Sequence, residues 1–472
     1  GGSFGGGKAL DITTPIPTPS GWTTMGALRA GDVVFDENGK PTRVTEAFPI
    51  IEEPESYRVT FSDGAEVLAC ADHKWLTMDL VERVKAARRT EKFRVERRAK
   101  RQSRSKGISS PAFIEMMNKR NSERVNYYLD PPTGTVRTTR EIANTLLSSH
   151  GMTNHSVSVT KPLDLPDAIL PIPPYTLGAW LGDGNTGSGS ITCADPEILD
   201  EIRKDGFEIN ATKDPIHFRI VGLTARLRSL GVLGNKHVPL AYQRASHAQR
   251  LSLIQGLMDT DGTVAKRSGS AEFVITKWEL AEGMHELIVG MGWKANIREG
   301  RAKLYEKDCG PKYTIKWMPS EKVFRLRRKV DIQKIGSRST NGYRYIMSCE
   351  RIDSVPMRCI SVDSPSHLYL AGRNMIPTHN SSGLVRFAIY LAGMYPGINI
   401  LITRNTLANL KNPGGTIDQF NAALPGAGAL IKDGGIVYRP ITDNNPRCQI
   451  RLPTWPPGVK SSVYFRGADD DS

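Results

Sequence analysis

Three consecutive residues, His379-Asn380-Ser381, have the side chains that a self-cleaving peptide bond needs. An asparagine amide can attack its own carbonyl carbon, close a five-membered succinimide and break the peptide bond that follows. A neighbouring histidine can protonate the leaving amine, and a serine hydroxyl can carry an acyl group as an ester. These three residue types also meet by chance, so the surrounding sequence decides what they indicate.

The surrounding sequence is a phosphate-binding motif that is divided between two distant parts of the chain. The chain opens with GGSFGGGK, and after Asn380 it continues with SSGLVRFAIYLAG. Joining Lys8 to Ser381 restores G-x-x-x-x-G-K-S ahead of an apolar helix, which is the pattern of a P-loop. The motif predicts binding of ATP phosphates and Mg²⁺, after removal of residues 9–380, by Gly2, Gly7, Lys8 and Ser381.

Both ends of the segment 9–380 consist of short apolar stretches between turn residues, the pattern of β-strands. The stretches 14–32, 67–76 and 358–380 resemble, in this order, the splicing blocks of inteins. The resemblance implies an all-β, horseshoe-like (HINT) module that excises itself, needs no cofactor and acts as a monomer. It also implies that His73 assists cleavage after Lys8, and that Asn380 cyclises with help from His379 and His367.

One position departs from the usual intein pattern. The first residue of the segment is Ala9, whose methyl group cannot attack the preceding carbonyl carbon. The group called class 3 inteins lacks this first nucleophile and uses an internal cysteine with a tryptophan and a threonine as companions. Cys359, Trp75 and Thr378 stand at the matching places, which favours class 3. The alternative is an intein of the ordinary class that is blocked because Ala9 replaces its nucleophile.

A degenerate repeat lies in the middle of the chain. Its copies are LGAWLGDG at residues 177–184 and IQGLMDTDG at residues 254–262, each an apolar helix with small residues that ends in Asp-Gly. Small residues allow two helices to pack closely, which would bring Asp183 and Asp261 together at one end. Two adjacent carboxylates are costly unless they share a divalent cation.

The repeat resembles the LAGLIDADG homing endonucleases. The resemblance implies an α+β domain in which Asp183 and Asp261 bind Mg²⁺ and catalyse cleavage of double-stranded DNA, with β-sheets in the major groove. The DNA partner would be the host gene site that lacks the insert. A folded but decayed endonuclease is the alternative, and the sequence does not identify the basic catalytic residue of this family.

Charge and composition agree with a DNA partner. The net charge is +14, and Lys and Arg are dense in residues 82–106, for which a DNA-contacting element and a solvated linker both remain open. Six cysteines without a C-x-x-C pair indicate reduced thiols. Neither a bilayer-spanning run nor a signal peptide is present, so we expect a cytoplasmic location and no membrane partner.

These patterns predict a multidomain chain. Its parts are an N-terminal flank (1–8), a first splicing half (9–80), a basic region (81–165), an endonuclease domain (166–330), a second splicing half (331–380) and a C-terminal flank (381–472). The two flanks resemble an α/β P-loop ATPase of the terminase large-subunit type, which implies a bacteriophage protein in a bacterial cell. The flanking sequence lacks an acidic strand end for water activation, so we expect an incomplete motor.

Overall fold

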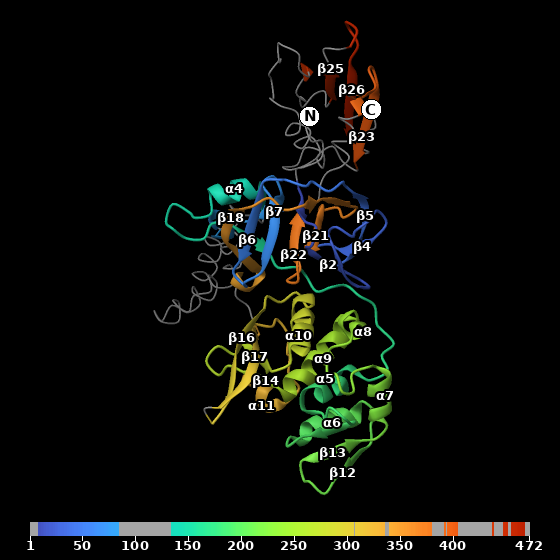
Figure 1. Ribbon diagram of the computed structural model, residues 1–472, viewed down its shortest axis with the longest axis vertical. Coiled ribbons are helices and arrows are strands. Elements are labelled where there is room, and N and C mark those ends of the chain that lie inside the picture. Colours follow the sequence, from blue (N-terminus) through green and yellow to red (C-terminus); the bar gives the residue numbers. More distant parts are fainter. Residues whose placement is uncertain are drawn as a thin grey trace, which may run out of the picture. The chain divides into compact units, whose positions relative to one another are not determined.

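The structure is a computed structural model of the chain. It describes residues 8–84, 134–305, 307–335, 339–379, 391–392, 394–404, 437–438, 447–451 and 455–467. The chain divides into two compact units, Gly1–His379 and Asn380–Ser472, so the boundary lies one residue before the predicted junction. Figure 1 shows the elements of each unit.

The first unit contains a β-rich module built around a six-stranded sheet, in the order β10-β18-β6-β7-β1-β19 (Figure 1). The sheet joins strands from both ends of the insert, because β1 lies between β7 and β19, with Leu10 opposite both Ala69 and Arg358. The beginning of the insert is therefore held by both halves. The strands are β1 (Leu10–Asp11), β6 (Ser56–Phe61), β7 (Glu66–Cys70), β10 (Ser156–Ser158), β18 (Tyr343–Ile352) and β19 (Met357–Arg358).

Smaller sheets complete this module. They pair β2 (Pro15–Thr18) with β3 (Gly21–Thr24), β4 (Val33–Phe35) with β5 (Pro41–Ala47) and β20 (Ile360–Val362), β8 (Lys74–Thr77) with β9 (Thr135–Thr138), and β21 (Leu368–Ala371) with β22 (Ile376–His379). Helix α4 (Thr139–Asn144) begins with a capping box between Thr138 and Glu141. Burial alternates along β6, as expected for a strand with one face on a core.

Part of the predicted basic region belongs to this β-rich module. Strand β9 pairs with β8, and β10 pairs with β18, so residues 135–138 and 156–158 belong to the sheets and are not a linker. The strands are only three and four residues long, too short for a clear alternation of apolar and polar residues. The dense basic run from Lys85 to Lys106 lies outside the described residues.

The first unit also contains an α+β module of two similar halves. The first half comprises α5 (Pro174–Asp183), β11 (Ser190–Thr192), α6 (Pro196–Lys204), β12 (Ile209–Ala211), β13 (His217–Ile220) and α7 (Leu223–Ser229). After α8 (Leu240–Gln243), the second half comprises α9 (His247–Thr260), β14 (Gly262–Val264), β15 (Ala271–Ile275), α10 (Trp278–Gly290), β16 (Asn296–Leu304), β17 (Lys307–Trp317) and α11 (Arg327–Val330). Each half places a sheet after its first helix, in agreement with the predicted repeat.

The two repeat helices, α5 and α9, pack backbone against backbone. A Cβ atom on Gly178 would lie 2.3 Å from the carbonyl oxygen of Leu253, and one on Gly256 would lie 2.2 Å from that of Tyr175. Any side chain at these two positions would separate the helices. The prediction that small residues allow close packing is confirmed, and the close approach places Asp183 and Asp261 at the same end of the pair.

The second unit is described in part. Strand β23 (Asn399–Arg404) runs parallel to β26 (Ser461–Gly467), which pairs antiparallel with β25 (Arg447–Arg451), and β24 (Val437–Tyr438) lies at the edge. Strand β23 is formed by the apolar run that begins near Ile398. The predicted helix after Ser381 lies almost entirely outside the described residues. Within the described part of the chain, no helix combines the length and apolar character needed to cross a membrane.

Candidate functional site

Ala9 lies in the interior of the β-rich module, with none of its surface exposed. Its carbonyl oxygen accepts a hydrogen bond from the backbone N–H of Cys70 at 3.0 Å, and its own N–H donates to the Cys70 sulfur at 3.1 Å. Ala9, Cys70, Met357 and Cys359 form one buried cluster. The predicted nucleophile Cys359 is therefore beside the residue that follows the Lys8 carbonyl.

Cys359 is held in this position by the arginine that precedes it. The Arg358 guanidinium donates to the carbonyl oxygens of Phe48 at 2.7 Å and of Gly26 at 2.7 Å. The Cys359 carbonyl accepts from the Phe48 N–H at 3.0 Å. These bonds hold the backbone on both sides of Cys359 in place.

His73 connects the first splicing half with the second. Its Nε2 atom forms a buried hydrogen bond with Oγ1 of Thr378 on β22. Burial lowers the pKa of His73 to about 3, while contact with the Lys8 backbone acts in the opposite direction. The imidazole is therefore neutral near pH 7 and lies close to the residue whose carbonyl would be attacked.

Trp75 packs its ring against His73. The two rings are T-shaped, with centroids 4.8 Å apart, and the indole N–H donates to Oγ1 of Thr139 at 3.0 Å. Thr139 also donates its backbone N–H to the carbonyl oxygen of His73 at 2.9 Å. The first residue of α4 thus fixes both the predicted tryptophan and the predicted histidine.

A third pair of predicted residues lies beside this arrangement. The rings of His367 and His379 are stacked, with centroids 6.2 Å apart and planes 25° from parallel. His367 has a positive φ of 57°, which a non-glycine residue adopts at some energetic cost. The turn before β21 therefore directs His367 toward the downstream end of the insert. Asn380, Ser381, Gly2 and Gly7 lie outside the described residues.

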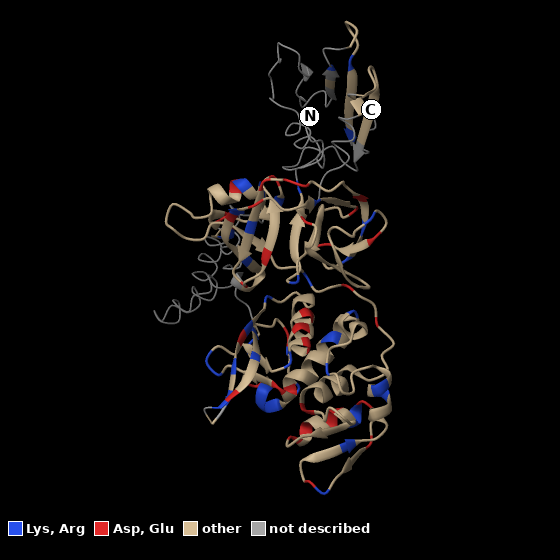
Figure 2. Ribbon diagram, in the orientation of Figure 1, with Lys and Arg blue, Asp and Glu red and all other residues tan. Residues whose placement is uncertain are grey.

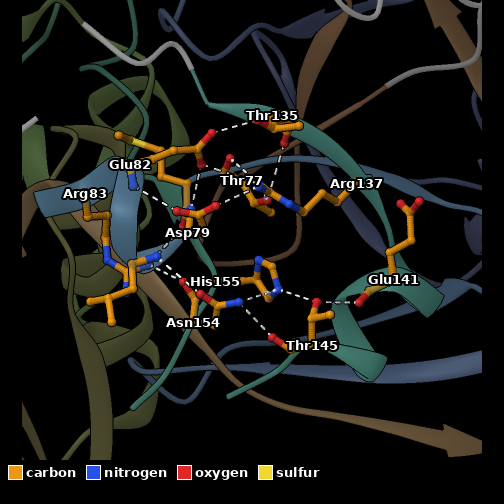
Figure 3. Close-up of polar contacts among 12 residues, drawn as sticks. Thr77, Asp79, Glu82, Arg83, Thr135, Arg137, Glu141, Thr145, Asn154 and His155 are labelled. Carbon is orange, nitrogen blue, oxygen red and sulfur yellow. Dashed lines mark hydrogen bonds and ion pairs between the residues drawn. The ribbon is translucent and has the colours of Figure 1, made fainter. Parts of the chain in front are cut away.

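A polar network fixes the strands that carry Trp75 (Figure 3). The Arg137 guanidinium contacts Asp79 at 3.0 Å, and Arg83 donates to the carbonyl oxygens of Met78 and Asn154 at 2.9 and 2.6 Å. Arg83 is buried, and burial lowers its pKa. The DNA-contacting role that was left open for the basic run is therefore wrong for Arg83, because its guanidinium group donates its hydrogen bonds to buried carbonyl oxygens.

The second candidate site is at the shared end of α5 and α9 in the α+β module. Burial raises the pKa of Asp261 to about 6, and the nearby charge of Asp183 adds to this effect. Burial also raises the pKa of Asp183, although its side chain still reaches solvent. The two predicted carboxylates are therefore brought close enough to interact.

Asp259, two residues before Asp261, has a different role. Its carboxylate accepts hydrogen bonds from the Tyr175 hydroxyl at 2.8 Å and from the backbone N–H groups of Arg325 and Leu326 at 3.1 and 3.2 Å. It is 1% exposed. Its bonding capacity is used in joining α9 to the segment before α11, so Asp261 is the aspartate of this pair that faces the site.

Two lysines that the sequence analysis did not assign flank the carboxylates. Lys236 donates to the carbonyl oxygen of Gly182 at 2.9 Å, and Lys329 donates to those of Asp259 and Gly262, each at 2.7 Å. Burial lowers the pKa of both lysines to about 8. They supply basic groups whose protonation changes near neutral pH.

The two carboxylates, Asp183 and Asp261, fit a divalent cation whose remaining ligands come from water and from the substrate. Among the described residues, no three His, Cys, Asp or Glu side chains form a metal-binding group. Mg²⁺ is commonly held by one or two carboxylates together with water and phosphate oxygens. Burial raises the pKa values of Asp183 and Asp261, and the charge of Asp183 adds to the effect on Asp261, so the two carboxylates suit this kind of site.

The residues that the sequence analysis missed share one property. Thr139, Arg358 and Cys70 act through contacts with backbone atoms far away along the chain. Cys70 could have been suspected because it lies three residues before His73 in the same block. Lys236 bonds the carbonyl oxygen of Gly182, which lies 54 residues earlier in the chain, and residue spacing does not reveal this contact.

Comparisons with known proteins relate parts of this chain to two groups. Residues 248–330, which include all of α9 except its first residue and also include Lys329, match the model of a LAGLIDADG-like domain. The chain is 39% identical over 383 residues to a replicative DNA helicase DnaB of Mycobacterium intracellulare, covering 80% of this chain and 59% of that protein. It is 44% identical over 73 residues to the DnaB of Mycobacterium leprae, covering 16% and 12% of the two chains.

Among solved structures, the crystal structure of the MchDnaB-1 intein is similar, with a TM-score of 0.25 and 18% identity, and covers 79% of this chain and 100% of that one. The expected terminase host and bacteriophage origin conflict with these relatives, which are replicative helicases. A P-loop serves many classes of ATPase, so the restored motif did not distinguish between them. The comparisons place a LAGLIDADG-like domain in a chain whose relatives are DnaB proteins.

Proposed function

We propose that the chain is a precursor that excises residues 9–380 and joins Lys8 to Ser381 by protein splicing. The observation that carries this proposal is the position of His73, which bonds Thr378 and lies close to the backbone of Lys8. One neutral imidazole therefore serves a site that includes both ends of the insert. The adjoining pair of His367 and His379 supplies groups for the downstream cleavage.

The first step uses Cys359 as the nucleophile. Its sulfur bonds to the carbonyl carbon of Lys8, the bond from that carbon to the Ala9 nitrogen breaks, and the thiol proton ends on the new Ala9 amine. Trp75 and Thr378 hold His73 beside this bond. The buried cluster of Ala9 and Cys359 supports the class 3 route, and an insert blocked by Ala9 is the alternative.

The later steps transfer the acyl group and release the insert. The Ser381 hydroxyl attacks the thioester, and the Cys359 sulfur leaves and regains a proton. The Asn380 amide nitrogen attacks its own carbonyl carbon, which breaks the bond to Ser381, and the freed Ser381 amine converts the ester to a peptide. His379 and His367 assist cyclisation by moving the proton to the leaving amine.

Purified precursor analysed by mass spectrometry tests this function. We expect an excised product of residues 9–380 and a ligated product of the flanks. Cys359→Ala should abolish both products, and Ala9→Cys should leave the rate within about tenfold. Rapid splicing of Ala9→Cys together with an inert parent chain would instead favour the blocked alternative.

We infer that the insert also carries a site-specific endonuclease for double-stranded DNA. One face of the sheet β14-β15-β17-β16 is polar, because the register places Arg298, Lys312 and Lys316 on the same side. In the other half, Ser190 pairs with Arg219, and Thr192 with His217. Figure 2 shows basic residues along β16 and β17 and at α11. Such faces can contact phosphates and base edges.

Mg²⁺ held by Asp183 and Asp261 would supply activation of water and stabilisation of the leaving oxygen. Lys236 and Lys329 stabilise negative charge beside the carboxylates, since their ammonium groups already bond the ends of α5 and α9. Incubation of the chain with a plasmid that carries the uninterrupted host site, with Mg²⁺ or with EDTA, tests the activity. Specific DNA binding without cutting would favour a decayed enzyme.

We propose that the flanks form part of a P-loop ATPase, and the relatives favour a helicase of the DnaB type as the host. Gly2, Gly7, Lys8 and Ser381 would hold ATP and Mg²⁺ after splicing, because the lysine and the serine then become adjacent. In support, β23 and β26 form a parallel pair, as in α/β ATPases. ATP hydrolysis by unspliced Cys359→Ala chain would contradict this proposal.

A further inference from the structure

The turn that joins β21 to β22 is strained at Met375. The turn comprises residues 372–375, and Met375 has a φ of 51°, in the left-handed region that a non-glycine residue adopts at an energetic cost. Its backbone N–H donates to the carbonyl oxygen of Gly372 at 2.9 Å and closes the turn. Such a conformation persists only where surrounding contacts hold it. The contacts of this turn therefore decide where β22 begins.

The side chain of Met375 is buried in an apolar cluster to which both modules contribute. Met375 and Leu370 come from the hairpin, Phe35 from β4, Leu163 from the connection between the modules, and Val289 from α10. Met375 and Val289 are both 0% exposed. The α+β module thus supplies part of the apolar surface that holds the strained residue in place.

Asn374, the residue before Met375, bonds both modules. Its side-chain amide donates to the carbonyl oxygen of Ala295 at 3.2 Å, directly before β16, and to Oδ2 of Asp63 at 3.3 Å in the β-rich module. The fully buried guanidinium of Arg344 donates to the Asn374 carbonyl oxygen at 2.9 Å and to Asp63 at 2.6 Å. The turn is therefore bonded to the α+β module as well as to the sheet that contains β18.

A buried ion pair fixes a further contact between the two modules. Arg244, directly after α8, lies 2.6 Å from a carboxylate oxygen of Glu286 in α10, and the two side chains are 6% and 9% exposed. The Arg244 guanidinium also donates to the carbonyl oxygens of Thr18 and Gly21 at 2.9 and 3.0 Å, in the hairpin of β2 and β3. A buried ion pair needs a defined geometry to offset its desolvation, so α10 is held against the β-rich module in one arrangement.

Among the splicing steps, acyl transfer depends most on the position of the hairpin. In this step the Ser381 oxygen bonds to the Lys8 carbonyl carbon, the bond from that carbon to the Cys359 sulfur breaks, and the hydroxyl proton passes to the sulfur. The two reacting groups come from different parts of the chain and must meet within bonding distance. Asparagine cyclisation, in contrast, takes place within one residue and does not need this meeting.

Resting on the proposed splicing function, we propose that Asn374 and Met375 are positioning residues, through which the α+β module brings Ser381 to the thioester on Cys359. Strand β22 is four residues long and is paired with β21 over its whole length. A shift at the turn is therefore carried to His379, two residues before Ser381. A loosened turn would still permit both cleavages but would separate them, so the flanks would be cut without being joined.

Mass spectrometry of the purified chain tests this inference through the ratio of joined flanks to flanks that are cleaved but not joined. We expect Val289→Ala to lower this ratio by about tenfold, because Met375 loses a contact and the reacting groups are misplaced. Val232→Ala is the matched control. It makes the same substitution at another 0% exposed position of the α+β module, outside the shared cluster, and should leave the ratio unchanged.

A second matched pair repeats the comparison if Val289→Ala does not fold. Asn374→Ala removes the bonds to Ala295 and Asp63 and should lower the ratio, whereas Asn154→Ala removes a bond of 3.0 Å to the Thr145 carbonyl within the β-rich module and should not. Equal ratios within either pair, in a parent chain that splices, overturn the inference and leave the splicing proposal standing. A parent chain that yields neither product refutes both.

Discussion

His73 and Thr378, which are 305 residues apart in the sequence, share a buried hydrogen bond between the two halves of the β-rich module. Thr378 directly precedes His379, and His73 lies close to the backbone of Lys8. The same contact therefore couples the position of the upstream bond to the position of the downstream residues. Splicing needs this coupling, because acyl transfer must precede release of the insert.

Loss of the Thr378 hydroxyl should impair the first cleavage. Thr378→Val keeps the volume but leaves a buried imidazole nitrogen without a partner, at a cost of about 1–3 kcal/mol. We expect the release of residues 1–8 to slow by about 10–100-fold. Thr378→Ser keeps the hydroxyl and is the matched control. Equal rates for the valine and serine variants would show that the hydrogen bond has no part in the reaction.

The buried state of His73 predicts a dependence of stability on pH. Its pKa is about 3 in the folded protein and 6.5 when exposed, so the unfolded chain gains a proton first as the pH falls. Stability from this group is complete above pH 6.5 and decreases below it, by about 2 kcal/mol between pH 7 and pH 5.

Urea unfolding of the Cys359→Ala chain, which remains intact, measures this effect at each pH. His155 and His285 also have lowered pKa values and act in the same direction. The free energy of unfolding is therefore compared, at each pH, between the Cys359→Ala chain and a chain that carries both Cys359→Ala and His73→Gln. The free energy of unfolding of the second chain should depend less on pH. Identical pH dependence in both chains would contradict a neutral, buried His73.

The contact between α5 and α9 should not tolerate a methyl group. Gly256→Ala places Cβ against the Tyr175 carbonyl, where the helices must separate. We expect a loss of about 3 kcal/mol, together with loss of DNA cleavage, because Asp183 and Asp261 would move apart. Gly187→Ala is the control, since its nearest neighbour would be 3.5 Å away. Thermal unfolding of both variants measures the difference.

Replacement by asparagine should change the stability of the protein in opposite directions at Asp259, in α9, and at Asp261, directly after α9. Asp261→Asn removes a carboxylate whose pKa is raised to about 6 by burial and Asp183, so we expect a stability gain of about 1–3 kcal/mol above pH 6, and no DNA cleavage. The gain should decrease as the pH falls below 6, where the native carboxyl becomes protonated, and should disappear near pH 3.8, where the unfolded chain also becomes protonated.

Asp259→Asn should instead destabilise the protein. It loses an acceptor for Tyr175 and for the backbone of Arg325, at a cost of about 1–3 kcal/mol. Melting temperatures of the two variants at pH 7.5 and pH 5 distinguish them. A stabilising Asp259→Asn, or a destabilising Asp261→Asn, would exchange the roles assigned to these residues.

Elements and site residues could be predicted from the sequence where a local pattern of apolar residues and a chemically reactive side chain occur together. The repeat with its two aspartates is confirmed as α5 and α9. The strand pairs β8–β9 and β10–β18 were missed because the two strands of each pair lie far apart in the sequence. In addition, β8, β9 and β10 are only three or four residues long. The roles of Thr139 and Arg358 are recognisable only from their contacts with backbone atoms far away in the sequence.

The burial of Ala9 in the middle of a sheet has a kinetic consequence. An amine released at this position stays within the sheet, between β7 and β19, and cannot diffuse away from the newly formed thioester. On the proposed splicing route, recapture by the same amine competes with each forward step, so the first exchange would be a reversible equilibrium. Closure of the asparagine ring would then be the first irreversible step, and the unspliced chain would persist until that step.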